Sequence, residues 1–428
     1  MTLGLADDLD DLMGDFEQEE DINTTIVDVV QEKESWITLS GDYTFSTAYN
    51  YDKAATIEGL SRLRNTLNLT LDMEFSKNWK SKVEMKALGD PVYELRDISG
   101  FTETLEEEQE FKEAYIQGTM GNFDLKIGRQ ITVWGKSDNI RITDVINPLD
   151  NREIGMVDIE NLRLPVNTSK LSYFAGDYAF KVAVIHEARI QKEAAVGSEF
   201  FPSSIFPPAF VIPSVIDPES DKDSAQYTTS IDGTFSGWDI SFYAAKVLDQ
   251  RWHLENSNTI RTYTPITMSG FALNIASGSW IFKTESALLD DLRYNTTTQE
   301  KRRLDSLVGI EYSGVKDVTT SLEVANRHIF DYEAQMLSAP DYVRKNEMQT
   351  ALRSSYTFDH DNATLTYLAT VTGYEFQDGG FQRFWLDYDY SDTIKLTTGF
   401  IDYFGGEKPY LEAISVNDRL FFDFKYSF

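Results

Sequence analysis

The sequence predicts an all-β protein, a transmembrane antiparallel barrel of about 18 strands, with about 16 as the alternative count. The first observation is the last strand, which places Phe422, Phe424, Tyr426 and Phe428 on one face. Successive side chains of a strand point to opposite faces, so this strand offers a row of aromatic rings to one medium. The second observation is that predicted hairpins have one apolar and one charged face. The third is that short and long connections alternate along the chain.

Composition is compatible with this class. The chain has 428 residues, 41% of them hydrophobic, and a mean hydropathy of −0.36. No stretch approaches the roughly 18–20 apolar residues of a spanning helix, but a barrel needs lipid contact from only every second residue. The 27 Phe, 22 Tyr and 7 Trp would supply interfacial girdles. The absence of cysteine excludes disulfides, thiolate metal sites and thiol nucleophiles.

The net charge of −31 argues against nucleic acid as a partner, because phosphate binding needs a basic surface. An acidic exterior suits a surface in contact with divalent cations and lipopolysaccharide, and it equally suits plain solubility. We therefore expect outer-membrane lipid and lipopolysaccharide as the surroundings, in the outer membrane of a bacterial cell. No leader peptide is recognisable, and residues 3–6 could at most be the tail of one. We therefore expect that the sequence is that of the mature chain.

Residues 1–35 form a separate acidic segment, with 12 acidic residues against one basic residue. Within it Leu5, Leu9, Met13 and Phe16 recur at helical spacing, which predicts a short amphipathic helix. Such a helix needs a surface to lie against, because isolated helices of this length are marginal in water. Three interpretations stay open: a plug in the barrel, a periplasmic docking peptide for a partner protein, or a disordered tail.

Residues 36–428 form the predicted barrel domain. Residues 67–75 and 79–87 alternate between apolar and polar side chains, and folding them about Lys77 gives a hairpin with one charged face. Opposite charges facing each other across an antiparallel pair are favourable. The charged face pairs Glu74 with Lys80 and Asp72 with Lys82, and its residues Lys80, Lys82 and Glu84 are expected to face the lumen.

Short and long connections alternate along the barrel domain. Tight turns are predicted near residues 121–122, 176–177, 236–237, 277–278, 314–315, 359–362 and 391–392. Longer connections are predicted at residues 50–60, 89–107, 135–166, 188–223, 249–258, 290–302, 330–346, 375–380 and 405–417. Short periplasmic turns with long extracellular loops are typical of outer-membrane barrels. A soluble β-sandwich or propeller is disfavoured by the lack of a repeat period and by the many charges on one strand face.

The most distinctive sequence motif lies in and just before the third long connection. It comprises Gly128-Arg129-Gln130, Trp134-Gly135, Asp144-Val145 and Asn147-Pro148-Leu149-Asp150. This motif resembles a little-characterised family of porin-like barrels of Gram-negative outer membranes. Genes of that family often lie beside inner-membrane exporters of the resistance-nodulation-division superfamily and a periplasmic carrier resembling lipid-binding proteins. The resemblance implies passage of small or hydrophobic, lipid-like molecules, as the outer-membrane element of an export or lipid-trafficking system.

In general porins the third outer loop folds inward and narrows the channel, and the 135–166 connection has the same ordinal position. The side chains proposed to line or brace a constriction are Trp134, Lys136, Arg141, Asp144, Asn147, Asp150 and Arg152. Charges of both signs in a narrow neck would set selectivity. The alternative is that the Asn-Pro-Leu-Asp text is only a capped turn.

The fourth long connection is rich in apolar residues and proline. Its apolar residues include Phe200, Phe201, Phe206, Phe210 and Ile212. The prolines keep the segment out of the sheet, and an apolar patch of this size is expected to be buried. The barrel interior, a hydrophobic ligand and a neighbouring chain are the candidate surfaces.

The chain end resembles the C-terminal signal of outer-membrane proteins, through Tyr426 and Phe428 and with Asp423 where glycine is usual. This implies the barrel assembly machinery as a partner. We expect no enzyme, metal or cofactor, because the histidines are scattered and there is no nucleophile elbow or phosphate loop. The alternatives are a passive diffusion porin, a surface binding protein or a barrel hydrolase.

Overall fold

The computed structural model describes residues 36–55, 57–96, 106–205, 213–216, 218–220, 225–255 and 260–428. The acidic segment with its predicted helix residues Leu5, Leu9, Met13 and Phe16 lies outside the described residues, as do Phe206, Phe210 and Ile212. Residues 37–428 form one compact unit.

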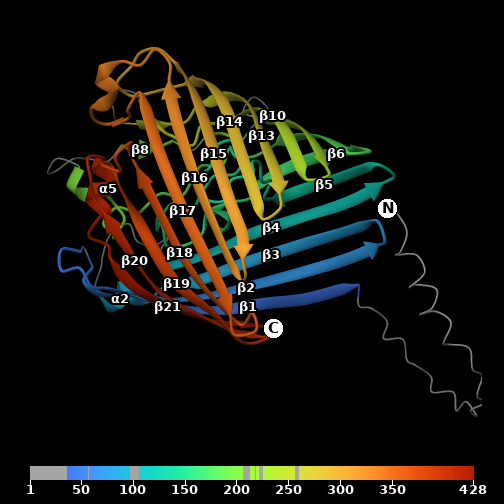
Figure 1. Cartoon of the computed structure of the whole chain (residues 1–428), viewed down its shortest axis with the longest axis horizontal. Helices are drawn as coiled ribbons and strands as arrows, with labels where there is room; N and C mark the ends of the chain where they lie inside the picture. Colours follow the sequence, from blue (N-terminus) through green and yellow to red (C-terminus); the bar gives the residue numbers. More distant parts are fainter. Residues whose placement is uncertain are drawn as a thin grey trace, which may run out of the picture. The chain divides into compact units, whose positions relative to one another are not determined.

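The unit is a closed barrel of 18 antiparallel strands, which confirms the predicted fold class and count (Figure 1). The strands are β1 Ile37–Asn50, β2 Gly59–Ser76, β3 Trp79–Gly89, β4 Glu107–Met120, β5 Phe123–Gln130, β6 Val166–Ala175, β7 Tyr178–Ile185, β9 Gln226–Phe235, β10 Trp238–Leu248, β13 Pro265–Ser277, β14 Trp280–Leu292, β15 Lys301–Val315, β16 Val318–Ile329, β17 Asn346–Phe358, β18 Ala363–Thr372, β19 Gly379–Ser391, β20 Ile394–Phe404 and β21 Arg419–Ser427. Each strand pairs with its neighbours in chain order, and β1 closes the ring by pairing with β21.

The predicted hairpin forms with the predicted register, Asp72 opposite Lys82 and Glu74 opposite Lys80. β6 and β13 are each paired on both sides, so the count is 18 and not the alternative 16. Besides shifts of one to four residues at strand ends, three features differ from the prediction. β2 is longer than expected, with 18 residues, because it stays paired with β1 from Gly59 to Met73. The β15–β16 turn lies at residues 316–317, where Asp317 adopts a φ of 60°.

The third difference is a small sheet outside the barrel wall. Its strands are β8 Ser214–Val215, β11 His253–Glu255 and β12 Ile260–Thr262, so the fifth connection extends to residue 264. The helices are short: α2 Val92–Leu95, α4 Ile159–Leu162, α5 Pro409–Ile414, and the 3-10 turns η1 Ser203–Ile205 and η2 Ala334–Leu337. None of the helices in the described ranges is long and apolar enough to span a membrane.

The barrel has a loop side and a turn side. The long connections, with α2, α5 and β8, gather at one end in Figure 1, and the C-terminus lies at the other end among the tight turns. We call these ends the loop side and the turn side.

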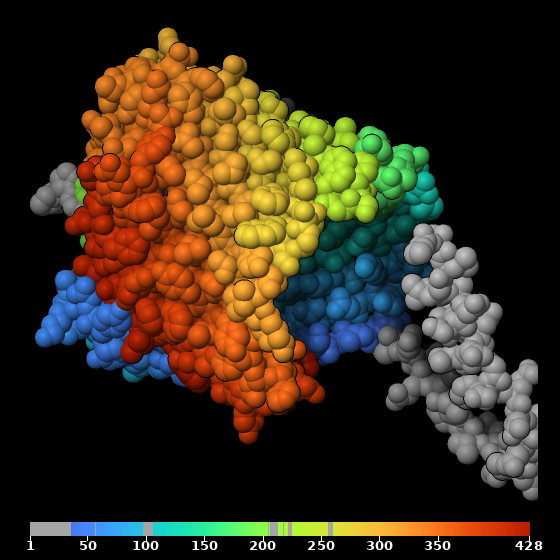
Figure 2. Space-filling view, in the orientation of Figure 1, coloured from blue at the N-terminus to red at the C-terminus, as the bar shows by residue number. Residues whose placement is uncertain are grey.

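Opposite strand faces meet different surroundings. In β21, Leu420 is 52% exposed, whereas its neighbour Phe421 is 7% exposed and packs inside. The same alternation runs around the wall, whose outward apolar side chains include Phe111, Ile127, Leu171, Phe242, Phe282, Val308, Leu322, Tyr356, Phe384 and Tyr426. Figure 2 shows the outer surface over β14–β20, coloured yellow to red, as a continuous layer of side chains. An outward apolar belt is the pattern of a transmembrane barrel.

Candidate functional site

Residues 131–165, which we call the inward segment, connect β5 to β6 across the barrel interior. The segment bonds to β10, β14 and β16 at its beginning and to β2, β4, β17 and β19 further along. β4 and β14 lie on opposite sides of the ring of 18 strands. A chain that touches both walls must therefore cross the lumen between them.

Glu285 on β14 holds the first part of the inward segment. Its carboxylate accepts hydrogen bonds from the backbone N–H groups of Lys136, of Ser137 at 2.6 Å and of Thr143 at 3.2 Å. The Thr143 hydroxyl donates a further bond of 2.8 Å. Gly135 makes this approach possible, since its φ is +89° and a Cβ there would lie 2.8 Å from Glu285 Oε1. A charged acceptor with several N–H donors is a strong anchor.

Glu323 on β16 provides a second anchor for the same stretch. It accepts hydrogen bonds from the N–H groups of Asp138 at 2.8 Å and Asn139 at 3.0 Å. The Asp138 carboxylate in turn pairs with Lys283 on β14, which also contacts Glu311 at 3.3 Å. The two wall carboxylates thus fix the backbone of residues 135–143 against one side of the lumen.

Glu153 ties the middle of the inward segment to the opposite wall. It pairs with Arg62 at 2.6 Å and Arg64 at 2.7 Å, both on β2. Burial opposes ionisation of this carboxyl, but the charges of the two arginines outweigh it and hold the pKa of Glu153 well below its usual range. Glu153 is therefore a carboxylate throughout the neutral range, and it anchors the segment electrostatically.

Asp158 forms the next anchor, between β17 and β19. It pairs with Arg353 at 3.1 Å and also with Arg383, whose guanidinium donates to the Gly155 carbonyl at 3.0 Å. The Arg383 guanidinium lies 4.0 Å from the ring centre of Trp385. One carboxylate therefore neutralises two cations that the wall directs into the lumen.

The predicted constriction residues lie in this segment. Several of their side chains are buried in contacts with the segment itself or with the barrel wall and do not face an open channel. Trp134 is buried and stacks on Tyr243 of β10 at 4.6 Å between ring centres. Asn147 is 0% exposed; it accepts from the Thr132 N–H at 2.9 Å and donates to the Leu164 carbonyl at 2.7 Å. The Asn147 contacts bridge the two ends of the segment, and a role of these residues in a constriction stays a prediction.

The charged members are ion-paired. Asp144 accepts from Arg163 at 2.8 Å and pairs with Arg141 at 3.2 Å, and Arg141 also donates to the Asn147 carbonyl at 2.8 Å. Burial lowers the pKa of the Arg141 guanidinium, while the Asp144 charge opposes this change. Lys136 pairs with Asp239 on β10 at 2.5 Å.

Asp150 and Arg152 attach the segment to β4. Arg152 pairs with Asp150 at 2.6 Å and with Glu108 on β4 at 2.9 Å. Burial would raise the pKa of the Asp150 carboxyl, but the hydrogen bond and charge of Arg152 lower it overall. Lys192 of the next connection joins the same network, at 2.6 Å from Glu108.

The predicted lumen residues of β3 lie on its inner face. Lys82 pairs with Glu84 at 2.9 Å and with Glu113 at 3.1 Å, and Glu84 pairs with Lys112 at 3.0 Å. Lys80 lies opposite Glu74 and Gln117 in the sheet register. This wall is polar, as an aqueous lumen requires.

Two phenylalanines of the proline-rich fourth connection are described. Phe200 is 2% exposed and packs among inner-wall residues, with its ring 4.7 Å from the Arg419 guanidinium and edge-on to Tyr403. Phe201 lines the large cavity described next. The connection therefore runs into the barrel mouth at residues 200–201.

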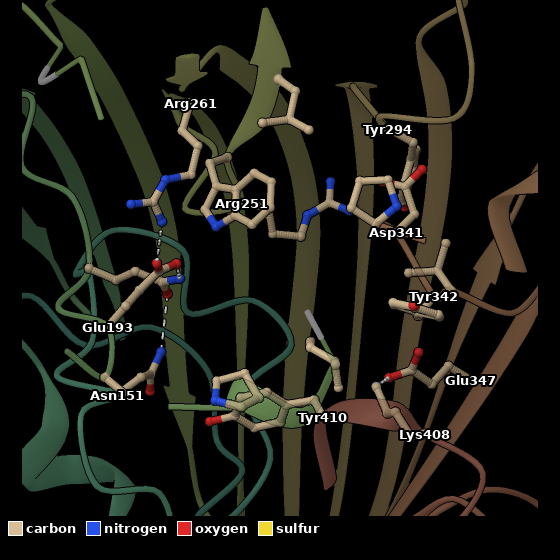
Figure 3. A pocket seen from close by; sticks show the side chains of 18 of the residues that line it. Asn151, Glu193, Arg251, Arg261, Tyr294, Asp341, Tyr342, Glu347, Lys408 and Tyr410 are labelled. Atoms are coloured by element: carbon tan, nitrogen blue, oxygen red, sulfur yellow. Dashed lines mark hydrogen bonds and ion pairs between the residues drawn. The ribbon is translucent and has the colours of Figure 1, made fainter. Parts of the chain in front are cut away.

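A cavity of about 670 Å³ lies on the loop side of the inward segment. Its apolar lining comes from several connections and includes Ile154, Phe201, Pro202, Ile205, Trp252, Leu254, Ile329, Val343 and Tyr410. Figure 3 shows Arg261 and Glu193 on one side, facing Tyr294, Asp341, Glu347 and Lys408 on the other. Its floor includes Arg327 of β16, which donates to the Arg141 carbonyl of the inward segment at 3.3 Å.

Several charged groups around this loop-side cavity form ion pairs, and the Asp341 carboxylate accepts hydrogen bonds from Asn295 and Thr296. Arg261 contacts Glu193 at 3.1 Å, and Lys408 contacts Glu347 at 2.6 Å, as the dashed lines in Figure 3 mark. Arg344 contacts Asp378 at 2.8 Å. The walls therefore combine neutralised ion pairs with apolar and aromatic surface, a mixture typical of small-molecule sites.

Two smaller cavities adjoin the first part of the inward segment. One, of about 420 Å³, is lined by Lys136, Asp158, Arg353 and other polar residues. The other, of about 250 Å³, is lined by residues 131–136 and by β6, β7, β9 and β10. Both have more polar linings than the loop-side cavity.

The comparisons with known proteins agree with this architecture. A family described as a protein of unknown function (DUF1302) matches residues 38–428. The chain belongs to this family. No curated protein matches it significantly.

Among solved structures, the outer membrane protein opdK of Pseudomonas aeruginosa is 7% identical with a TM-score of 0.53, over 91% of this chain and 99% of that one. OccD3 (OpdP) of the same organism is 9% identical with a TM-score of 0.52, over 91% of each chain. OccAB2 of Acinetobacter baumannii is 9% identical with a TM-score of 0.51, over 92% and 98%. At these identities the likeness establishes a porin-like fold. Together with the apolar outer belt, it supports localisation in the outer membrane.

Several residues that organise the lumen of this DUF1302 member were not predicted as site residues. Glu285, Glu323, Glu153 and Asp158 hold the inward segment, and their partners are distant in sequence. A signal existed in part, because a carboxylate on the charged face of a strand faces the lumen. Within the described residues, no group of three or more His, Asp or Glu side chains could hold a metal ion.

Proposed function

We propose that this barrel passes small, hydrophobic or amphipathic molecules across the outer membrane, as a selective channel. The observation that carries the proposal is the loop-side cavity of about 670 Å³, which has largely apolar walls, whereas the smaller cavities beside the inward segment are polar. A passive pore for salts and sugars has no need of such walls, whereas an apolar cargo gains free energy by leaving water there. The inward segment below the cavity would act as the selectivity barrier.

We further propose that the barrel is the outer-membrane element of an export or lipid-trafficking system. The support is the resemblance of the 128–150 text to barrels encoded beside inner-membrane exporters and periplasmic carriers. In this proposal the acidic residues 1–35 dock such a partner. Deleting residues 1–20 should then abolish transport in cells and leave the conductance of the purified barrel unchanged. A rise in conductance would instead indicate a plug, and no change in either would indicate a tail.

Reconstituted flux tests the main proposal. Proteoliposomes should admit short-chain fatty acids or similar amphipathic probes faster than sugars of equal mass. Protein-free liposomes give the background permeation, which is substantial for apolar probes. Size-dependent swelling with sugars and no preference for amphipathic solutes would favour a passive diffusion porin, a function that the polar smaller cavities also suit. Mass spectrometry of molecules retained by the purified protein would name the cargo.

A further inference from the structure

Lysines face one another on the inner wall of β5 to β7. Lys126 of β5 lies directly opposite Lys170 of β6 in the sheet register. Lys181 of β7 is opposite Ser172, two positions along β6 from Lys170 and on the same face. Like charges placed opposite each other across an antiparallel pair are destabilising. Such an arrangement calls for a compensating negative charge.

Glu113 and Asp124 attract both ammonium groups from a distance, but no carboxylate of the described residues forms an ion pair with either of them. None lies within 4.0 Å of the Lys126 or Lys170 ammonium group. Glu113 pairs with Lys82 at 3.1 Å, and Asp124 accepts hydrogen bonds from Gln117 at 2.8 Å and from Thr119. Lys126 contacts the Tyr115 ring at 3.6 Å, which offers a weaker cation–π attraction.

Lys170 lines the cavity of about 250 Å³ beside the inward segment. Lys136 and Lys181 line it too, but each has its own acid, Asp239 at 2.5 Å and Asp232 at 3.0 Å. Lys170 is thus the unneutralised cation of this cavity among the residues that the structure describes.

Hydroxyl groups complete the lining. Thr228, Ser230 and Tyr243 border the same cavity, and of these the Ser230 hydroxyl already donates to Asp232 at 3.0 Å. The Tyr243 hydroxyl accepts a hydrogen bond from the Gly135 N–H at 3.2 Å, so its own proton can be donated. Converging ammonium and hydroxyl donors match the acceptor oxygens of an oxyanion. At ~30 Å³ for each water, the volume equals roughly eight waters, enough for a phosphate or a short carboxylate.

We propose that Lys170 and the hydroxyls of Thr228 and Tyr243 form a binding site for a small oxyanion, a phosphate or carboxylate group, beside the inward segment, and that Lys126, opposite Lys170 in the sheet, adds positive charge behind it. We call it the basic cleft. The proposal deepens the proposed function, because an anionic group at one end of an otherwise apolar cargo would use both cavities. Only its consequence for transport rests on the proposed function, since oxyanion binding can be measured on a barrel that transports nothing.

Titration calorimetry of the purified full-length barrel in detergent tests the cleft. The probes are inorganic phosphate, acetate and glycerol 3-phosphate, at low ionic strength. We expect saturable binding of an oxyanion, at least about tenfold weaker in the K126Q/K170Q variant. The matched control is Lys316→Gln, in the β15–β16 turn with a 93% exposed side chain, which should bind like the unaltered protein. Tighter binding of glycerol 3-phosphate than of phosphate would indicate a lipid headgroup as the source.

Absence of saturable binding for all three probes would overturn the proposal, and so would equal binding by K126Q/K170Q. Heat-modifiable migration on gels verifies that each variant is folded, and single Lys170→Gln replaces the double variant if that one misfolds. Planar-bilayer recordings separate the two proposals. Oxyanion binding by a barrel that carries no current would refute the channel and keep the cleft. Current without oxyanion binding would refute the cleft alone.

Discussion

The Thr143 hydroxyl donates a hydrogen bond of 2.8 Å to Glu285 Oε2, and this contact joins the middle of the lumen to its wall. The same carboxylate accepts backbone N–H groups at Lys136, Ser137 and Thr143. One side chain of β14 therefore sets the position of a whole turn of the inward segment. Conductance and selectivity should depend on such anchors as much as on residues that face the open path.

Glu285→Gln should loosen the inward segment. The amide replaces one acceptor oxygen by a donor that faces N–H groups, and each buried donor left unpaired costs about 1–3 kcal/mol. We expect a lower unfolding temperature and a larger, noisier single-channel conductance in planar bilayers. Glu84→Gln is the control, because Glu84 is an inner-wall carboxylate whose ion-pair partners among the described residues are Lys82 and Lys112. Identical traces for the two variants would contradict the anchoring role.

Asp158→Asn should shift ion selectivity toward anions. Asp158 is the shared partner of Arg353 and Arg383, so its neutralisation leaves both guanidinium charges uncompensated in the lumen. Reversal potentials under a salt gradient measure the shift, which charged lumen residues are known to control. Asp290→Asn is the control, since Asp290 pairs with the exposed Arg302. A reversal potential equal to that of the unaltered protein would show that these charges lie outside the conducting path.

The Glu153 anchor should withstand mild acid. The pKa of Glu153 is held well below its usual range, with burial opposed by Arg62 and Arg64. Its ionisation therefore contributes stability that is complete above the unfolded pKa of about 4.3 and is lost as the pH falls through the lower folded pKa. Conductance should stay constant from neutral pH to about pH 5 and change only in stronger acid.

Glu153→Gln should have, already at neutral pH, the altered conductance that the unaltered protein reaches only in strong acid. Glu160→Gln, an exposed residue of the same segment without an ion pair among the described residues, should behave like the unaltered protein. A conductance change between pH 7 and pH 5 that persists in Glu153→Gln would assign the titration to another group.

Phe200→Ala should detach the fourth connection from the inner wall. The ring is 2% exposed and contacts Arg419 and Tyr403, and truncation of a buried Phe typically costs about 3–5 kcal/mol. We expect faster proteolysis within residues 186–225 and a lower unfolding temperature. Leu337→Ala, at a position 52% exposed in the seventh connection, is the control. Equal proteolysis rates would mean that other contacts hold this connection.

The charged face of the β2–β3 hairpin shows what could be predicted from sequence. The pairing of Asp72 with Lys82 follows from alternation and one turn position, and the structure has this register. The small sheet of β8, β11 and β12 could not be predicted in this way, because its two- and three-residue strands have no measurable period. The inward crossing of residues 131–165 was anticipated only through its resemblance to porin loops.

Sequence by itself predicted the barrel strands, a count of about 18 and the side of each strand that meets lipid. These are local properties, since side chains two positions apart share a face and glycine, asparagine or aspartate marks each turn. Only the tertiary structure decided which wall residue meets which part of the inward segment. Thr143 and Glu285 are 142 positions apart, and nothing in either neighbourhood specifies the other. Closure of the barrel brings them together, because it fixes the distance and direction between all strands at once.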